Sequence, residues 1–155
     1  MSDSICPELL SHLTELFEDA FGPVGDERLL HVHAPGRSEI SGNHTDHEGG
    51  HVIAAALDVA VDGLARPNGT NTVRSEGYPL IEVGLDTLDV AEDEKGTTAS
   101  LVRGMAHEVA ANGGTPTGFD LAMTCTVPSG GGLSSSAAVE GAFGRAMEAL
   151  WGVTP

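Results

Sequence analysis

The sequence predicts an α+β fold, and two observations lead to this prediction. Helix-like and strand-like segments are mixed along the chain without regular strand–helix alternation, and 155 residues is an ordinary length for one domain. Apolar residues make up 40% of the chain, but aromatic residues only 4%, and 21 residues are glycine. The core should therefore consist of aliphatic side chains and closely packed backbone.

The first predicted element is an amphipathic helix at residues 7–21. Its apolar side chains share one face: Leu9, Leu13, Leu16, Phe17 and Ala20. Pro7 suits a first helical turn, and the sequence GPVGDE at 22–27 ends the helix.

Strands are predicted after this helix. Residues 29–37 favour a short strand that runs into a turn at Pro35-Gly36. Residues 51–67 favour a long strand that is partly buried on both faces. Asn68-Gly69 then predicts a tight hairpin turn, and residues 78–86 indicate a second strand pair.

The second half of the chain begins with an acidic loop at 89–97, in which Glu92, Asp93 and Glu94 are expected to be solvated. A helix follows at 97–114, ended by two glycines. Its apolar positions are Leu101, Met105, Ala106 and Val109. Residues 118–128 predict a strand, and a last helix follows a glycine-rich turn. The apolar face of that helix consists of Val139, Phe143, Met147 and Leu150.

The chain is strongly acidic, with 23 Asp and Glu against 7 Lys and Arg and a formal net charge of −16. Such a surface repels nucleic acid and anionic membranes, so neither is expected as a partner. A phosphate ligand would have to be held by backbone dipoles, a few arginines and a metal ion.

Two further features predict a cytoplasmic protein. Cys6 and Cys125 lie far apart in the sequence and are expected to be reduced thiols. The chain has no apolar run of membrane-spanning length, and its N-terminus lacks the basic region of a secretion signal.

The turn VPSGGGLSSSAAVE, Val127 to Glu140, is the most specific local signal. Glycines at 130–132 let the backbone turn sharply, and serines then open a helix. The free N–H groups and positive dipole end of a helix bind phosphate, and serine hydroxyls can add hydrogen bonds or hold Mg²⁺. The alternative is an ordinary helix with Ser134 as its N-cap. The turn is neither a P-loop nor a dinucleotide-binding fingerprint.

A histidine-rich stretch between residues 44 and 51 contains His44, Asp46, His47, Glu48 and His51. A sugar pocket would use such side chains for directional hydrogen bonds to hydroxyl groups. The spacing H-x-x-H-x-x-x-H with Asp46 could also ligate a metal, but Gly49-Gly50 opposes a continuous helix and HExxH is absent. We therefore favour the sugar pocket, while His47 and His51 need have no role beyond a polar loop.

Together the two stretches resemble the motifs of the GHMP small-molecule kinases. PSGGGLSSSAA is similar to their second motif, and APGRSEISGNHTDHEGGHV resembles the N-terminal signature of the galactokinases. The resemblance implies that residues 1–155 are a GHMP kinase N-terminal domain, with the signature at 34–51 and an ATP-phosphate loop at 127–138. The implied fold is a mixed β-sheet packed on helices, like domain 2 of ribosomal protein S5, with the active site in a cleft against a second domain.

The same resemblance implies roles for particular residues. Arg37 matches an arginine near the transferred phosphoryl group, and Ser136 matches a serine close to Mg²⁺. The sugar-binding segment would be Asn43, His44, Thr45 and Asp46. The ATP phosphates would be held by Ser129, Gly130, Gly131, Gly132, Leu133, Ser134, Ser135 and Ser136. The implied reaction transfers the γ-phosphoryl group of ATP to the C1 hydroxyl of galactose, with Mg²⁺.

The sequence departs from the galactokinase signature at four positions, Glu39, Ser41, Asn43 and His47. Asn43 stands where the signature has Glu, and an amide both donates and accepts but binds a hydroxyl less strongly than a carboxylate does. The exact sugar therefore stays open. A kinase for an N-acetylated hexosamine or another small alcohol and a non-catalytic galactose- and ATP-binding sensor are the alternatives. For Arg37 the alternative is a structural ion pair with Glu39 or Asp46.

The family's catalytic aspartate lies downstream of the second motif, and the chain stops at Pro155. No residue is therefore assigned as the catalytic base. We expect the 155-residue chain alone to lack kinase activity. We also expect the face left by the second domain to be apolar and to favour self-association.

Overall fold

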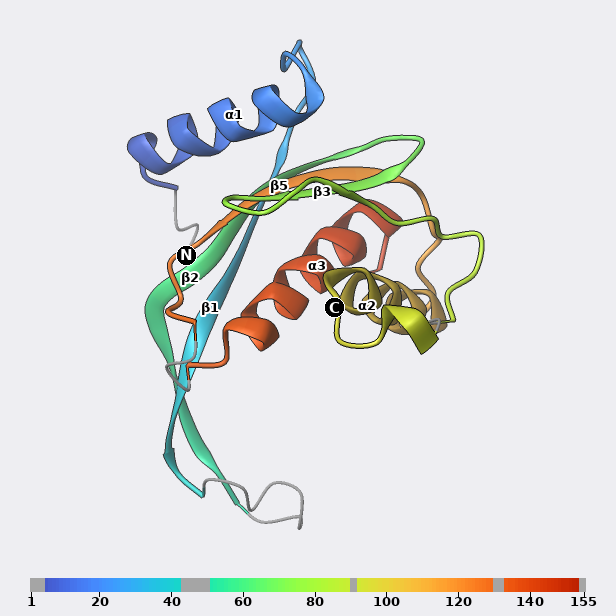
Figure 1. Ribbon diagram of the computed structural model, residues 1–155. Coiled ribbons are helices and arrows are strands. Elements are labelled where there is room, and N and C mark those ends of the chain that lie inside the picture. The colour runs from blue at the N-terminus through green and yellow to red at the C-terminus, as the bar shows by residue number, and fades with distance from the viewer. Residues whose placement is uncertain (1–4, 43–50, 90–91, 130–132, 154–155) are drawn as a thin grey trace.

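The computed structural model describes residues 5–42, 51–89, 92–129 and 133–153, and its elements form three layers (Figure 1). Helix α1 lies on one face of a twisted β-sheet, and helices α2 and α3 lie on the other. The α+β prediction is confirmed. The predictions for residues 43–50 and 130–132 lie outside the described residues.

The sheet has the order β1-β2-β5-β3-β4. Its strands are β1 (Leu30–Ser41), β2 (Ile53–Pro67), β3 (Asn71–Ser75), β4 (Ile81–Glu82) and β5 (Phe119–Cys125). Strand β5 is antiparallel to β2 on one side and parallel to β3 on the other. The sheet is therefore mixed, as the resemblance implied.

Helix α1 (Pro7–Phe21) has the bounds that its sequence predicts. Leu13 and Phe17 are fully buried against Leu64 of β2 and Ala122 of β5. Alternate residues of a strand point to opposite faces of a sheet, so the neighbours of these two strand residues serve the other layer.

The larger core lies beneath the other face, where α2 (Thr98–Ala111) and α3 (Ser135–Trp151) pack on the sheet. Aliphatic side chains dominate this core, as expected from the composition, and Phe119, Phe143 and Trp151 add bulk. Helix α3 buries the small residues Ala138, Ala142 and Ala146, so its backbone can approach the sheet closely.

The turn predicted at Pro35-Gly36 is wrong, because β1 continues through it to Ser41. The pairing of β1 with β2 shifts register between Pro35 and Arg37, so a local irregularity replaces the turn. A Cβ on Gly36 would lie 3.3 Å from the Leu133 carbonyl oxygen and from the Val127 side chain. Glycine thus lets β1 pass close to the start of α3.

The hairpin predicted at Asn68-Gly69 is also wrong. The chain does reverse there, but β2 and β3 do not pair with each other, because β5 lies between them. Phe119 pairs with Pro67 on one side and with Asn71 on the other. The Asn68 N–H donates to the Gly118 carbonyl at 2.8 Å, which fixes the start of β5 inside the turn.

The acidic segment is not wholly solvated. It contains a short 3₁₀ helix, Glu92–Glu94, and the carboxylate of Glu94 forms a two-point ion pair with Arg103 of α2. The prediction was therefore wrong for Glu94, whose side chain is only 24% exposed, whereas that of Glu92 is 88% exposed.

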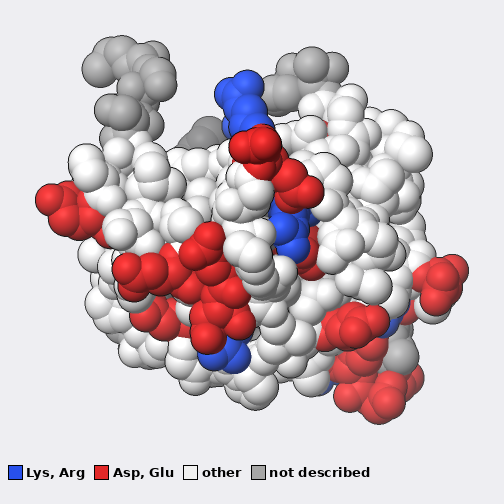
Figure 2. All heavy atoms as spheres, turned by 90° about the horizontal axis from the view of Figure 1, so that it is seen from above, with Lys and Arg blue, Asp and Glu red and all other residues white. Residues whose placement is uncertain are grey.

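Acidic side chains predominate over basic ones on the face seen from above (Figure 2), in keeping with the net charge of −16. Among the described residues, no helix is both long and apolar enough to cross a membrane.

Candidate functional site

The described end of the glycine-rich turn, Leu133–Ser136, has an unusual backbone. Ser134 occupies the N-cap position of α3 in the left-handed conformation, with φ 57° and ψ 48°. It is a strained choice for a residue other than glycine. The Ser134 side chain makes no capping hydrogen bond. Ser134 is therefore at the N-cap position, but its side chain does not accept the backbone hydrogen bond that an ordinary capped helix would have.

The Ser134 hydroxyl instead meets Arg37. Arg37 Nε donates to Ser134 Oγ at 3.3 Å, and the Arg37 backbone N–H donates to the Leu133 carbonyl, also at 3.3 Å. These contacts bring the N-terminal signature and the glycine-rich turn together across 97 residues of sequence. The arginine side chain is 53% exposed, so its guanidinium is accessible to a ligand.

The structural alternative for Arg37 is also visible. Arg37 Nη2 lies 3.3 Å from Glu39 Oε1. An ion pair of this length at the surface contributes at most about 1 kcal/mol to stability. The ion pair and a role toward a ligand are compatible, because the guanidinium has further donors.

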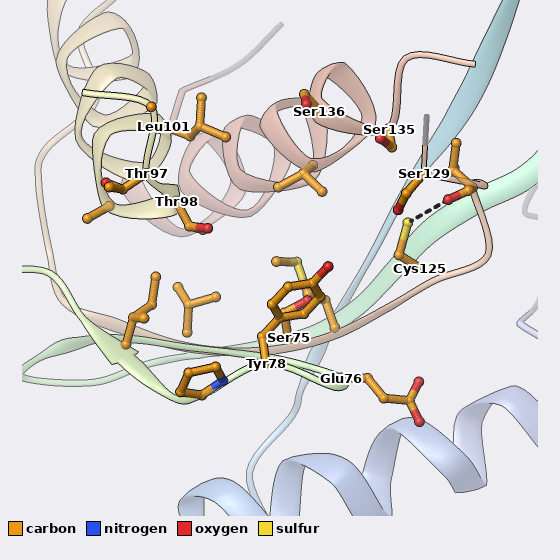
Figure 3. Close-up of a pocket in the computed structure, with 18 residues that line it drawn as sticks. Ser75, Glu76, Tyr78, Thr97, Thr98, Leu101, Cys125, Ser129, Ser135 and Ser136 are labelled. Atoms are coloured by element: carbon orange, nitrogen blue, oxygen red, sulfur yellow. Dashed lines mark hydrogen bonds between the residues drawn. The ribbon is translucent and has the colours of Figure 1, made fainter. Parts of the chain in front are cut away.

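A pocket of about 710 Å³ opens beside the turn, between the β3–β4 edge of the sheet and the N-terminal ends of α2 and α3 (Figure 3). Its hydroxyl groups belong to Ser75, Tyr78, Thr97, Thr98, Ser129, Ser135 and Ser136. Its apolar floor consists of Val73, Ile81, Leu101, Met123, Val127 and Val139. Three of the predicted phosphate-loop serines, at 129, 135 and 136, thus line one cavity.

The chemistry of this pocket suits a nucleotide. The volume lies within the range of small-molecule sites, and an apolar floor with a hydroxyl-rich end matches a base and a phosphate chain. The first residues of α3, Ser135 and Ser136, border this end, and the unpaired N–H groups and dipole of a helix N-terminus favour negative charge. None of the described residues that line the pocket is Lys or Arg. A bound phosphate chain would therefore need a cation, and the Ser136 hydroxyl is an oxygen ligand of the kind that Mg²⁺ accepts.

Among the described residues that line the pocket, Glu76 is the one acid, and its carboxylate points away from the cavity, toward α1 (Figure 3). It accepts a short hydrogen bond from the Thr124 hydroxyl and lies 2.8 Å from His12 Nε2. The Thr124 hydrogen bond is the main reason that the pKa of Glu76 lies below its ordinary value. A charged Glu76 held in this way does not compete for the cation of a nucleotide.

The predicted sugar-binding residues, Asn43 to Asp46, and the glycines at 130–132 lie outside the described residues. Strand β1 ends at Ser41 and strand β2 begins at Ile53, and these two residues pair with each other. They lie at the end of the β1–β2 arm, the paired residues 37–41 and 53–56. No group of three or more metal-ligating His, Cys, Asp or Glu occurs in the described residues. The histidine cluster lies largely outside them, so its metal alternative is not tested.

Tyr78, Thr98 and Cys125 also line the pocket, and none of them belongs to a recognisable motif. Thr97 carried a weak signal, because it is the first residue of the helix predicted at 97–114. In the structure it is the N-cap of α2 and accepts a hydrogen bond from the Ser100 N–H.

Comparison with known families gives two matches. Residues 15–67 match the galactokinase galactose-binding signature, and residues 100–155 match the N-terminal domain of the GHMP kinases. The first match contains Arg37 and the second contains the serine-rich turn. The chain is therefore similar to the N-terminal part of a GHMP kinase.

Within this superfamily the similarity is to galactokinases. The chain is 34% identical to the galactokinase of Lactococcus lactis subsp. cremoris over 153 residues, and 37% identical to that of Chloroflexus aurantiacus over 144 residues. These alignments include 92% and 91% of this chain but only 36% of either relative. The chain thus spans about a third of the length of the relatives it matches.

Solved structures agree with this assignment. The crystal structure of Lactococcus lactis galactokinase complexed with galactose superposes with a TM-score of 0.84 and 31% identity, over 95% of this chain and 38% of that one. Mevalonate kinase from Methanococcus jannaschii superposes at 0.65 with 15% identity, over 81% of this chain and 41% of that one. The second match concerns the fold alone.

Proposed function

We propose that the protein is an ATP-dependent galactokinase, which transfers the γ-phosphoryl group of MgATP to the C1 hydroxyl of galactose. The observation that carries this proposal is the contact of Arg37 with Ser134. It joins the segment that resembles a sugar-binding signature to a serine-rich turn beside a nucleotide-sized pocket.

MgATP would lie with its nucleoside in the pocket and its phosphates at the turn. Ser129, Ser135 and Ser136 offer hydroxyl groups there, and the start of α3 offers backbone N–H groups. Leu133, Ser134 and the glycines at 130–132 complete the loop by resemblance. Mg²⁺ would neutralise phosphate charge that this acidic chain is poorly equipped to meet, with Ser136 near it.

The sugar would be held by the segment Asn43 to Asp46. Support comes from the match of residues 15–67 to a galactose-binding signature, and from the galactose in the similar Lactococcus lactis structure. Arg37 would stabilise charge on the transferred phosphoryl group, since phosphoryl transfer depends mainly on positioning and electrostatic stabilisation. We assign no catalytic base within this chain.

A sugar panel tests the proposal. The intact protein is supplied with MgATP and, in separate reactions, galactose, glucose, N-acetylgalactosamine and no sugar, and ADP formation is measured. We expect galactose to be preferred. N-acetylgalactosamine as the better substrate would instead support the N-acetylhexosamine kinase, and tight galactose binding without ADP formation would support the sensor.

A further inference from the structure

Arg103 of α2 is a buried charge that no motif predicts. Its residue is 9% exposed, on a helix face shared with Val102, Ala106 and Val109. Its Nε and Nη2 donate to the two carboxylate oxygens of Glu94, each at 2.8 Å. Its Nη1 donates to the backbone carbonyls of Gly84 and Thr87. One guanidinium thus connects the helix to both ends of the long segment that follows β4.

The segment borders the pocket at its two ends. The chain leaves β4 after Ile81–Glu82, passes Gly84 and Thr87, and returns through Glu94 to the N-terminal end of α2. Ile81, before the segment, and Gly96 and Thr97, at its end, line the pocket. Arg103 itself is not among the described residues that line the cavity, but its partners Gly84 and Glu94 lie within three residues of Ile81 and of Thr97.

The geometry requires an arginine. A planar guanidinium can bind a carboxylate at two points and still donate to two carbonyls, whereas a lysine ammonium is a single point with three donors. The hydrogen bonds with Glu94 raise the pKa of Arg103 above its already high ordinary value, so the side chain stays charged. Its removal would take two donors from the Glu94 carboxylate and one from each of the two carbonyls.

We propose that Arg103 is a positioning residue for the nucleotide. By fixing Gly84, Thr87 and Glu94 against α2, it sets the positions of the neighbouring pocket residues Ile81, Gly96 and Thr97 and so the affinity for MgATP, with no effect on the sugar segment. The inference rests on the proposed function, because it takes the pocket to be the MgATP site.

The test compares Arg103→Met and Arg103→Lys with the unchanged intact protein. Calorimetry measures the affinity for MgATP and, separately, for galactose. Arg145→Met is the matched control, because Arg145 forms an exposed pair with Glu148 on α3, and neither residue is among the residues that line the pocket. We expect Arg103→Met to weaken MgATP binding about tenfold or more, with galactose affinity unchanged. The MgATP affinity of Arg103→Lys should lie between those of Arg103→Met and the unchanged protein. Arg145→Met should bind both ligands normally.

The other possible outcomes would overturn either the inference or the proposed function. A folded Arg103→Met protein that binds MgATP normally would overturn the inference, as would an equal loss of affinity for both ligands, which would indicate a general structural role. Where Arg103→Met fails to fold, Arg103→Lys and Glu94→Gln decide, and normal MgATP affinity in both overturns it. Failure of the unchanged protein to bind MgATP would contradict the proposed function itself.

Discussion

Arg37 makes contacts that serve two different purposes at the level of the single residue. Its Nε reaches the serine-rich turn, and its Nη2 reaches Glu39. The first contact orients the guanidinium toward the proposed phosphate site, and the second limits its freedom. If the ion pair were the whole role, changing either partner would affect stability alone.

Replacement of Arg37 by Ala separates these roles. We expect kcat for galactose phosphorylation to fall by ~10³-fold or more, the scale of arginines that stabilise phosphoryl transfer. Unfolding midpoints should change little, because the ion pair is exposed. Glu39→Gln serves as the control, since it removes the pair but keeps the guanidinium. Near-normal turnover of Arg37→Ala in a steady-state assay would leave only the structural role.

Glu76 gives a prediction about pH. Its folded-state pKa is depressed, chiefly by the Thr124 hydroxyl and further by His12, so its charge stabilises the folded protein above the unfolded pKa. That contribution is lost as the pH falls through the folded pKa. Because the side chain is 44% exposed, the effect should stay below about 1 kcal/mol.

Glu76→Gln should therefore be less stable than the unchanged protein at pH 7. The difference should shrink as the pH falls from the unfolded pKa, about 4.3, through the lower folded pKa, below which the carboxylate is protonated in both states. Urea unfolding across this range checks it. A difference that is constant with pH would mean that the charge of Glu76 contributes nothing.

At the level of elements, local sequence signals predicted the helices well and the strand pairing poorly. Helix α1 matched its predicted bounds because Pro7 and an apolar face are local properties. The partner of β2 after Asn68-Gly69 is β5, which begins about fifty residues later at Phe119. An Asn-Gly pair predicts a reversal, but no local signal indicates that another strand will enter the gap.

The site divides in the same way. The turn and Arg37 carry motifs and were found. The pocket residues Tyr78 and Thr98 carry no motif, and neither does Arg103. Their positions depend on contacts between segments far apart in sequence. In the sequence Arg103 looks like an ordinary polar position of a helix. Only the fold shows that Glu94 and two carbonyls surround it.

Gly118 tests the insertion of β5. A Cβ at this position would collide with the Asn68 carbonyl oxygen and would lie 2.6 Å from the Thr70 nitrogen. These are backbone atoms, which cannot move aside cheaply, so Gly118→Ala should destabilise the fold by about 1–3 kcal/mol. Gly104→Ala is the control, because a Cβ there meets no atom within 4 Å. At this helix position, where the Cβ would have open space, the substitution should be neutral or stabilising by up to about 1 kcal/mol.

Equal denaturation midpoints for Gly118→Ala and the unchanged protein would show that Gly118 does not pack closely against the backbone of residues 68–70.

At the level of the whole molecule, the pocket lies between the β3–β4 edge of the sheet and the N-terminal ends of α2 and α3. Strands β1 and β2 extend away from the helices to the pair Ser41 and Ile53 (Figure 1). Arg37 lies on the part of β1 that passes the start of α3, and it connects this strand to the serine-rich turn.

The β1–β2 arm also exposes apolar side chains. Ile40 and Ile53 are 68% and 61% exposed, and Val52 is 43% exposed. Apolar patches of this kind favour association with another surface. Self-association of the 155-residue chain stays a prediction.

Cys125 offers the most direct test of the central claim, that MgATP binds in the pocket beside the serine-rich turn. Cys125 is exposed and lines the pocket, whereas Cys6 is exposed at the start of α1, on the other side of the sheet. The rate at which a maleimide labels each thiol is measured in the intact protein, without ligand, with galactose and with saturating MgATP. We predict that MgATP slows labelling of Cys125 by about tenfold or more, that Cys6 is unaffected, and that galactose alone protects neither thiol. Unchanged labelling of Cys125 at a MgATP concentration that supports galactose phosphorylation would contradict the claim, because the nucleotide would then bind elsewhere.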